Sequence, residues 1–135
     1  MPRRSPTRLI AAGATVVVAL GLTAGCSKSA GDRAATKPLP QPTAFAECAR
    51  CHRVEPGVHD VGPSLWGLSE RRAGSALGYS FSPALRGAGF TWDRQRLAVF
   101  LRDPHKTLPG TRMLYPGLED AKEAESVADY VLSLR

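Results

Sequence analysis

The five residues Cys48-Ala49-Arg50-Cys51-His52 constrain this chain of 135 residues more than any other stretch. Cys48, Cys51 and His52 stand at positions i, i+3 and i+4, so on one helical turn their side chains point to the same face. Two thiols that can add to two vinyl groups, beside an imidazole that can reach an iron atom, form the attachment pattern of a c-type haem. The motif therefore predicts one covalent haem c, bound through Cys48 and Cys51, with His52 on the iron.

Other uses of a Cys-x-x-Cys pair fit the sequence less well. A structural zinc site needs four ligands, and Cys26 is the only further cysteine. His59 and His105 are 46 residues apart, whereas the histidines of a zinc finger are separated by a few residues. A redox-active dithiol of the thioredoxin type lies in a βαβ pattern, which residues 40–65 do not show. The haem remains the preferred interpretation.

The N-terminal region is typical of an export signal. Residues 1–8 are basic, and residues 9–22 form an apolar run shorter than the ~20 residues that span a membrane. The run ends in Leu22-Thr23-Ala24-Gly25-Cys26, which resembles the lipobox of bacterial lipoproteins. That resemblance implies that residues 1–25 are a removed signal peptide and that Cys26 carries a lipid anchor to a membrane. The alternative is an ordinary signal peptide followed by an incidental cysteine.

Composition and charge separate a linker from the domain that follows it. Residues 26–42 are small and polar and include Pro38, Pro40 and Pro42, which favours a flexible, extended linker. The formal net charge of +6 includes arginines of the signal segment. The remaining basic residues are scattered, whereas nucleic-acid binding shows as a concentrated basic stripe. We expect no nucleic-acid partner.

Residues 43–135 form the predicted domain, and its helices are expected mainly in the second half. Residues 43–50 favour a short helix with Thr43 as its N-cap. A second helix is expected after a cap at Thr91 or Asp93 and before Pro104, and a third from about residue 119 to 134. Residues 103–117 are expected to form a loop.

The interval 53–90 holds ten Gly or Pro in 38 residues, which predicts loops and turns with room for one short helix. A compact domain tolerates such a stretch when a cofactor supplies a surface around which it wraps. Seven apolar side chains of the interval are predicted to line that cofactor: Leu65, Trp66, Leu68, Leu77, Tyr79, Phe81 and Leu85.

The sixth coordination position of a haem iron is either open or closed by a second side chain. Met113 is the candidate, because it follows the turn-rich residues 109–112 and because Met1 would be removed with the signal. Its thioether would favour ferrous iron. The alternative is that Met113 fills a gap in the core, as methionines often do.

Taken together, residues 43–135 resemble a class I cytochrome c of the mitochondrial and bacterial short-chain type. The matching stretches are residues 48–52, 62–65, 71, 78–80, 91–92, 104, 109–113, 117–118 and the terminal helix with Tyr130. The resemblance implies an all-α cytochrome c fold, with three to five helices around one covalent haem, and His52 and Met113 as axial ligands. It also places five residues around the haem. By the resemblance, the carbonyl of Pro63 accepts a bond from His52, and Arg71 and Trp92 hold a haem propionate. Tyr79 lies in the haem pocket, and Thr111 orders the side of the haem on which the methionine lies.

The resemblance implies an electron carrier rather than an enzyme. The carrier would pass single electrons between membrane or periplasmic redox proteins and would bind no small-molecule substrate. Partners would meet the haem edge, with a possible steering rim of Arg50, Arg53, Arg72, Lys106 and Arg112. The protein would act on the periplasmic side of a bacterial membrane, either lipid-anchored or free. Two alternatives stay open: a haem subunit of a larger periplasmic dehydrogenase or oxidase, and a haem sensor or peroxidase with a labile methionine.

Overall fold

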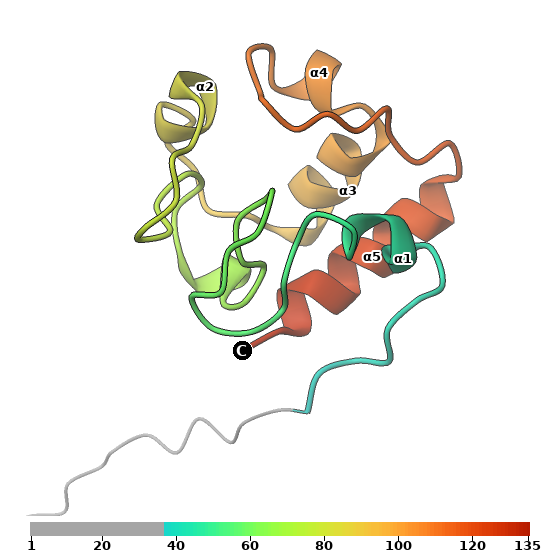
Figure 1. Cartoon of the computed structure of the whole chain (residues 1–135). Coiled ribbons are helices and arrows are strands. Elements are labelled where there is room, and N and C mark those ends of the chain that lie inside the picture. The colour runs from blue at the N-terminus through green and yellow to red at the C-terminus, as the bar shows by residue number, and fades with distance from the viewer. Residues whose placement is uncertain (1–36) are drawn as a thin grey trace, which may run out of the picture. The chain divides into compact units, whose positions relative to one another are not determined.

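The computed structural model describes residues 37–135, and these residues form helices and irregular loops without a β-strand. The elements in chain order are α1 (Phe45–Cys48), the 3-10 helix η1 (Leu68–Glu70), α2 (Pro83–Arg86), α3 (Arg94–Arg102), α4 (Pro104–Thr107) and α5 (Ala121–Ser133), as Figure 1 shows. The predicted all-α fold class is confirmed. The predicted signal peptide, Cys26 and residues 27–36 of the predicted linker lie outside the described residues.

Within residues 37–135, no helix combines the length and the apolar character that crossing a membrane requires.

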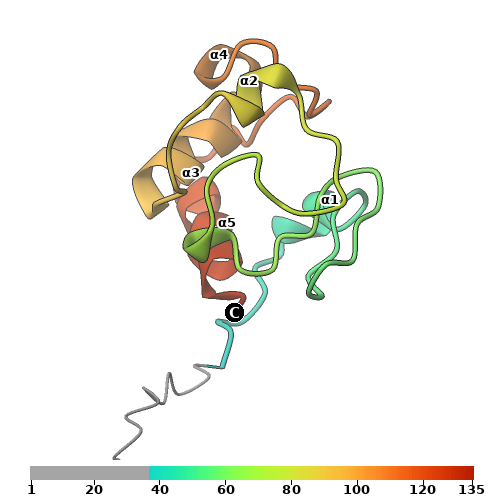
Figure 2. The ribbon, with the colours of Figure 1, turned by 90° about the vertical axis from the view of Figure 1, so that its left-hand side faces the viewer.

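The core is built on α3 and α5, which pack against each other and lie side by side in both views (Figures 1 and 2). Ala124, Val127 and Ala128 of α5 are completely buried, and their spacing places them on one face of the helix. From α3, Leu97 and Leu101 are buried in the same cluster. These two helices therefore form the packed part of the domain.

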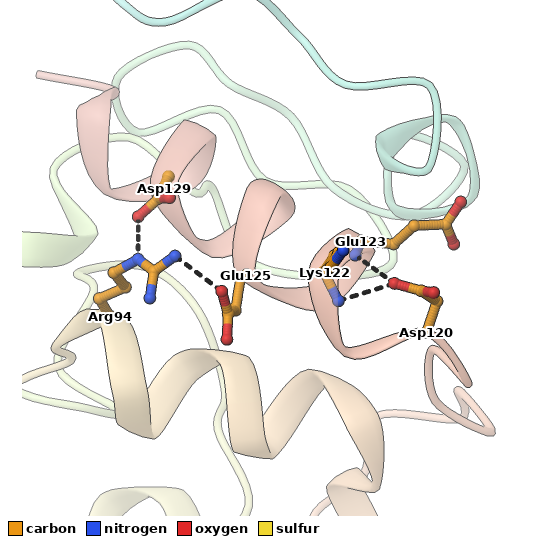
Figure 3. A network of polar contacts seen from close by, with 6 residues as sticks. All are labelled: Arg94, Asp120, Lys122, Glu123, Glu125 and Asp129. Carbon is orange, nitrogen blue, oxygen red and sulfur yellow. Dashed lines mark hydrogen bonds and ion pairs between the residues drawn. The ribbon is translucent and has the colours of Figure 1, made fainter.

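Aspartate side chains begin both long helices. Asp93 accepts a hydrogen bond from the backbone N–H of Arg96 at 2.7 Å, which confirms the predicted cap of α3. Asp120 accepts bonds from the N–H groups of Lys122 and Glu123 at 2.7 and 2.9 Å, as Figure 3 shows. Each cap satisfies N–H groups that have no partner within the first turn of its helix.

A short helix replaces part of the loop that was predicted for residues 103–117. Pro104 ends α3, as predicted, and is also the first residue of α4. The fixed φ of proline suits the first helical position, and Asp103 caps the new helix by accepting a bond from the N–H of Lys106 at 3.0 Å. The prediction of a continuous loop was wrong because Pro104 was interpreted only as a stop.

The first helix is shorter than predicted, and its predicted cap is wrong. Thr43 does not cap α1 through its side chain; the residue before the helix is Ala44, whose backbone is itself helical. Helical bonding continues past the C-terminus of α1, because the N–H of His52 donates to the carbonyl of Cys48 at 3.0 Å. Phe45 fixes the helix to α5, with its ring edge-to-face against that of Tyr130 at 4.8 Å.

The interval 53–90 is mostly irregular, as predicted, and is held together by bonds between side chains and backbone. His59 accepts a bond from the N–H of Ser64 at Nδ1 (2.9 Å), so its Nε2–H is free to donate to the carbonyl of Leu77 (2.8 Å). The hydroxyl of Tyr79 donates to the carbonyl of Val61 at 2.7 Å. Two loops distant in sequence are thereby joined beside α1.

Residues 37–42 were predicted as part of the flexible linker, yet they bond to the C-terminal half of α5. The N–H of Leu39 donates to the hydroxyl of Ser133 at 2.9 Å. The hydroxyl of Tyr130 donates to the side-chain carbonyl of Gln41 at 3.3 Å. We call residues 37–42 the strap, since they join α1 to the end of α5.

Candidate haem-binding site

A cavity of about 660 Å³ lies between the irregular interval and the two long helices. Most of its lining is apolar, and the helices contribute Leu97, Phe100, Leu101, Val127 and Val131. The volume and the apolar lining suit a large organic cofactor. The exposed lining residues define what we call the mouth of the cavity: Glu47, Arg50, Val61, Arg72, Ser80, Arg112, Leu114 and Pro116.

The three motif side chains line this cavity together. All three belong to its wall: Cys48 is the last residue of α1, and Cys51 and His52 lie on the helical turn that follows it. Both cysteines carry free thiols. Burial raises the pKa of the Cys48 thiol, which keeps that group neutral. The sequence motif is therefore placed as covalent attachment of a haem requires.

His52 is held in one orientation by its backbone surroundings. Its Nδ1 lies 2.8 Å from the carbonyl oxygen of Pro63, and because a carbonyl only accepts, Nδ1 carries the proton. Burial lowers the pKa of His52, so the ring is neutral and its Nε2 keeps a free lone pair. A carbonyl that fixes the second nitrogen of a metal-binding histidine is the usual outer partner of such a ligand.

Gly62 supplies the space that this ring needs. A Cβ atom at position 62 would lie 2.4 Å from Cε1 of His52, much closer than real Cβ contacts. The glycine is therefore required by the close approach of the backbone to the imidazole.

Met113 lines the same cavity from the loop that follows α4, and its side chain is partly buried. Its backbone N–H donates to the hydroxyl oxygen of Thr111 at 3.3 Å, and Thr111 itself is only 7% exposed. The structure thus brings Met113 to the cavity wall and places Thr111 against its backbone.

Arg71 and Trp92 form a polar region in the otherwise apolar wall. The guanidinium of Arg71 donates to the backbone carbonyls of Ser64 and Trp66, and burial lowers its pKa. Two carbonyls leave some of its five N–H donors and its charge uncompensated. Trp92 is 7% exposed and also lines the cavity, and its indole carries one N–H donor. Both groups suit an anionic substituent of the cofactor.

Two of the seven predicted lining residues were wrong. Leu77 is 92% exposed and contributes only its carbonyl to His59, and Trp66 packs against the core outside the cavity lining. The remaining five line the cavity: Leu65, Leu68, Tyr79, Phe81 and Leu85. Sequence analysis missed the helical side chains of the wall, although the apolar stripes of α3 and α5 could have indicated them.

Comparison with known proteins decides the family, because the family model described as cytochrome c matches residues 42–135. The chain belongs to the cytochrome c family. It is 41% identical to cytochrome c2 iso-2 of Magnetospirillum fulvum over 93 residues, which cover 69% of this chain and 97% of that protein. It is 36% identical to cytochrome c-554 of Methylosinus trichosporium over 84% of this chain and 83% of that protein. The solved structure of cytochrome cH from Methylobacterium extorquens has a TM-score of 0.61 at 44% identity and covers 65% of this chain and 89% of that one.

Family membership gives the site its cofactor and the chain its general activity. The cofactor is one covalently bound haem c, and the chain is a monohaem c-type electron carrier. The cavity fits that cofactor in three independent respects: two free thiols and an imidazole on one turn, a large apolar volume, and an uncompensated cation in the wall. These findings favour the carrier over a sensor, a peroxidase or an enzyme subunit.

Proposed function

We propose that this cytochrome c is an exported one-electron carrier whose haem is attached through Cys48 and Cys51 and whose iron is bound by His52 and Met113. One observation carries the proposal: all four side chains line a single cavity in a chain of the cytochrome c family. Redox proteins are its partners, and contact occurs at the mouth of the cavity.

The haem supplies a one-electron redox centre, and the residues of the chain determine what that centre can do. His52 is neutral and fixed in orientation by Pro63, so it offers a nitrogen lone pair without rearrangement. Met113 offers a neutral sulfur, which favours the ferrous state. With His52 and Met113 holding the iron, the chain would leave no ligand position for a substrate, and the mostly apolar wall would limit access of water. Electron transfer without bond making follows from this arrangement.

The state of the haem tests the core of the proposal. The full chain, produced in a bacterium that matures c-type cytochromes, should carry one haem that stays attached after denaturation and acid extraction. Oxidised protein should show the thioether-to-iron absorption band, and Met113→Ala should lose it while keeping the attached haem. A wild-type spectrum without this band at neutral pH would contradict closure by Met113 and would favour a sensor or peroxidase.

Export and anchoring form a second part of the proposal. Bacterial c-type cytochromes act on the outer side of the cytoplasmic membrane, which supports a signal at residues 1–25. The lipobox-like residues 22–26 support a lipid anchor on Cys26, with residues 27–36 in the linker to the domain. Cys26→Ser should move the protein from membranes to the periplasm and change the mass of its N-terminal peptide. A wild-type N-terminal peptide whose mass shows no added lipid would exclude the anchor.

A further inference from the structure

Trp92 lies between two aromatic rings in the wall of the cavity. Its ring centroid is 4.9 Å from that of Phe90, edge-to-face, and 5.1 Å from that of Phe100 at a tilted angle. Phe100 is 5% exposed and belongs to α3, so this side is fixed by the packed helices. Phe90 lies in the irregular interval and is only partly buried. The orientation of the indole therefore depends on what holds Phe90.

Arg96, in the first turn of α3, covers the ring of Phe90. The central carbon of its guanidinium lies 4.6 Å from the centroid of that ring, which is within the distance of a cation–π contact. Arg96 is not one of the residues that line the cavity. It can therefore influence the cofactor only through the residues that it holds.

The same guanidinium is bonded to both chain neighbours of Trp92. Its Nη1 donates to the backbone carbonyl of Thr91 at 3.1 Å and to the carboxylate of Asp93 at 2.7 Å. A planar guanidinium can do both, because its donors lie in the plane while its face stacks on a ring. We call residues 90–93 the Trp92 segment. Arg96 contacts each of its residues except Trp92 itself.

The Trp92 segment is also joined to the stretch that follows Arg71. The N–H of Ala73 donates to the carbonyl of Phe90 at 2.8 Å, and Arg72 pairs with Thr91 in an isolated antiparallel β-bridge. Residues 71–73 and α3 thus both hold the segment. These contacts set the relative positions of Arg71 and Trp92, the two groups that suit an anionic substituent of the cofactor.

We propose that Arg96 is a positioning residue that acts on the haem through Trp92, by holding the Trp92 segment so that the indole N–H stays available to a haem propionate. This inference rests on the proposed electron-transfer function and adds a residue that sets the reduction potential. The ion pair of Arg96 with Asp93 is exposed, so its direct contribution to stability is small. The effect of Arg96 lies in where it keeps Trp92.

The charge of the propionate gives the expected direction of the effect. A negative charge near the iron stabilises the ferric state, and an N–H group bonded to the propionate reduces that stabilisation. An indole that is held less firmly bonds the propionate less well. Loss of Arg96 should therefore favour ferric iron and lower the reduction potential.

The reduction potential of the holoprotein is the first measurement. In R96M, the ratio of ferric to ferrous protein at the wild-type midpoint potential should rise about threefold, which corresponds to a fall of about 28 mV. R94M is the matched control, because Arg94 lies in the same turn of α3 but bonds Asp129 and Glu125 of α5 (Figure 3). It removes the same charge and should change the ratio less than about 1.5-fold. Equal changes in R96M and R94M would overturn the proposal.

Salt and a neutral substitution separate the position of Trp92 from the charge of Arg96. Dissolved ions screen an exposed charge, so the fall of potential in R96M should persist at high ionic strength if it comes from positioning. F90L keeps every charge but removes the ring between Arg96 and Trp92, and it should lower the potential in the same direction. A fall in R96M that disappears at high salt, or an unchanged potential in F90L, would contradict the positioning role.

The indole proton gives a direct second measurement. The chain has two tryptophans, so the ferrous, nitrogen-15-labelled holoprotein should show two indole N–H signals in NMR spectra. The signal of Trp92 is the one that W92F removes, or the one that W66F keeps if W92F yields no holoprotein. Exchange of this proton with solvent should be about three- to tenfold faster in R96M and F90L and unchanged in R94M. The same exchange rate in wild type and R96M would overturn the proposal.

Failure of this inference differs visibly from failure of the proposed function. A wild-type chain without attached haem, or without a reversible one-electron wave, would reject the electron carrier itself. A normal wave whose potential is the same in wild type, R96M and F90L would reject only the role of Arg96.

Discussion

The helical half and the loop half of this cytochrome c, residues 91–135 and 43–90, are held together by different forces. In the helical half, α3 and α5 bury apolar side chains against each other, and Ala124, Val127 and Ala128 are fully enclosed. In the loop half, contacts such as His59 to Leu77 and Tyr79 to Val61 join side chains to backbone. Several of its large apolar side chains, among them Leu65, Phe81 and Leu85, line the cavity. The loop half therefore depends on what fills that cavity, whereas the helices also support each other.

The size of the cavity shows how far this dependence extends. A cavity of about 660 Å³ is too large for the surrounding side chains to collapse into, so their apolar surface would meet water if the haem were absent. A domain of this size is stable by only about 5–15 kcal/mol. The helical half contributes Leu97, Phe100 and Val127 to the cavity wall, so an unfilled cavity would destabilise the helices as well.

The largest effect should come from preventing haem attachment. We expect C48A/C51A to yield a colourless chain that does not fold cooperatively, since the exposed apolar wall would remove a large part of the small net stability of the domain. Far-UV circular dichroism during denaturant titration checks this, and Cys26→Ser, which leaves the motif intact, is the control. Cooperative unfolding of the colourless double variant would show that the helical half is stable alone.

The next largest effect should come from a substitution at Gly117, whose backbone packs closely against the C-terminal end of α3. Gly117→Ala would place a Cβ 2.0 Å from the carbonyl oxygen of Arg102, at a φ of +115° that side chains avoid. We expect the holoprotein to lose about 5 kcal/mol of unfolding free energy. Gly57→Ala is a matched control, because φ is +70° there but nothing lies within 4 Å, and it should cost about 1 kcal/mol. Similar losses of unfolding free energy in the two variants would mean that the backbone relieves the clash at position 117 at little cost.

Phe45→Ala probes the contact that joins the two halves. Phe45 is 1% exposed and packs edge-to-face on Tyr130, so its truncation should cost about 3–4 kcal/mol in denaturant unfolding of the holoprotein. Val58→Ala, at a residue that is 46% exposed, should cost less than about 0.5 kcal/mol. A loss at Phe45 no larger than that at Val58 would show that α1 adds little to the core.

Gly62→Ala should act on the loop half alone. The new Cβ would displace the His52 ring and lengthen its bond to the Pro63 carbonyl, at a cost of about 2 kcal/mol. The visible spectrum of the oxidised protein should change, while the far-UV circular dichroism of the long helices stays the same. An unchanged visible spectrum would refute the positioning role of Gly62.

The smallest effect is expected from the surface link between α3 and α5. Arg94 bonds Asp129 at 2.7 Å and Glu125 at 3.0 Å, as Figure 3 shows, and all three side chains are exposed. Because water and salt screen such pairs, Arg94→Ala should lower the melting temperature less than any variant above, and added salt should shrink the difference. A loss as large as that of Phe45→Ala would make this network a main support of the helical half.

The sequence predicted the two halves unequally, for a physical reason. Local patterns determine helices, so the stripe of α5 and the cap at Asp93 could be identified from periodicity and residue type. The attachment motif was equally local, because its three residues share one helical turn. Met113 was predicted from the turn-rich residues before it and from the expected removal of Met1, in agreement with the family resemblance, and the structure adds that it lines the same cavity as His52.

What failed depended on how the loops fold in three dimensions. Leu77 is apolar like its neighbours, but only the tertiary fold shows that it points to solvent. The ion pair of Arg53 with Asp60 and the bond from Arg86 to the carbonyl of Phe81 also have no local signal. Pro104 shows a different limit, since the same residue can end one helix and begin the next.

The strap has a consequence for how the domain turns in space. Its bonds from Leu39 to Ser133 and from Tyr130 to Gln41 fix the incoming chain at the foot of α5, opposite the end that carries α2 and α4 (Figure 1). If the chain is held at a membrane through its N-terminus, the domain would rotate about this attachment point at the C-terminal end of α5. Arg86 and Arg112 would then move farthest during thermal rotation, because they lie near the opposite end of the domain.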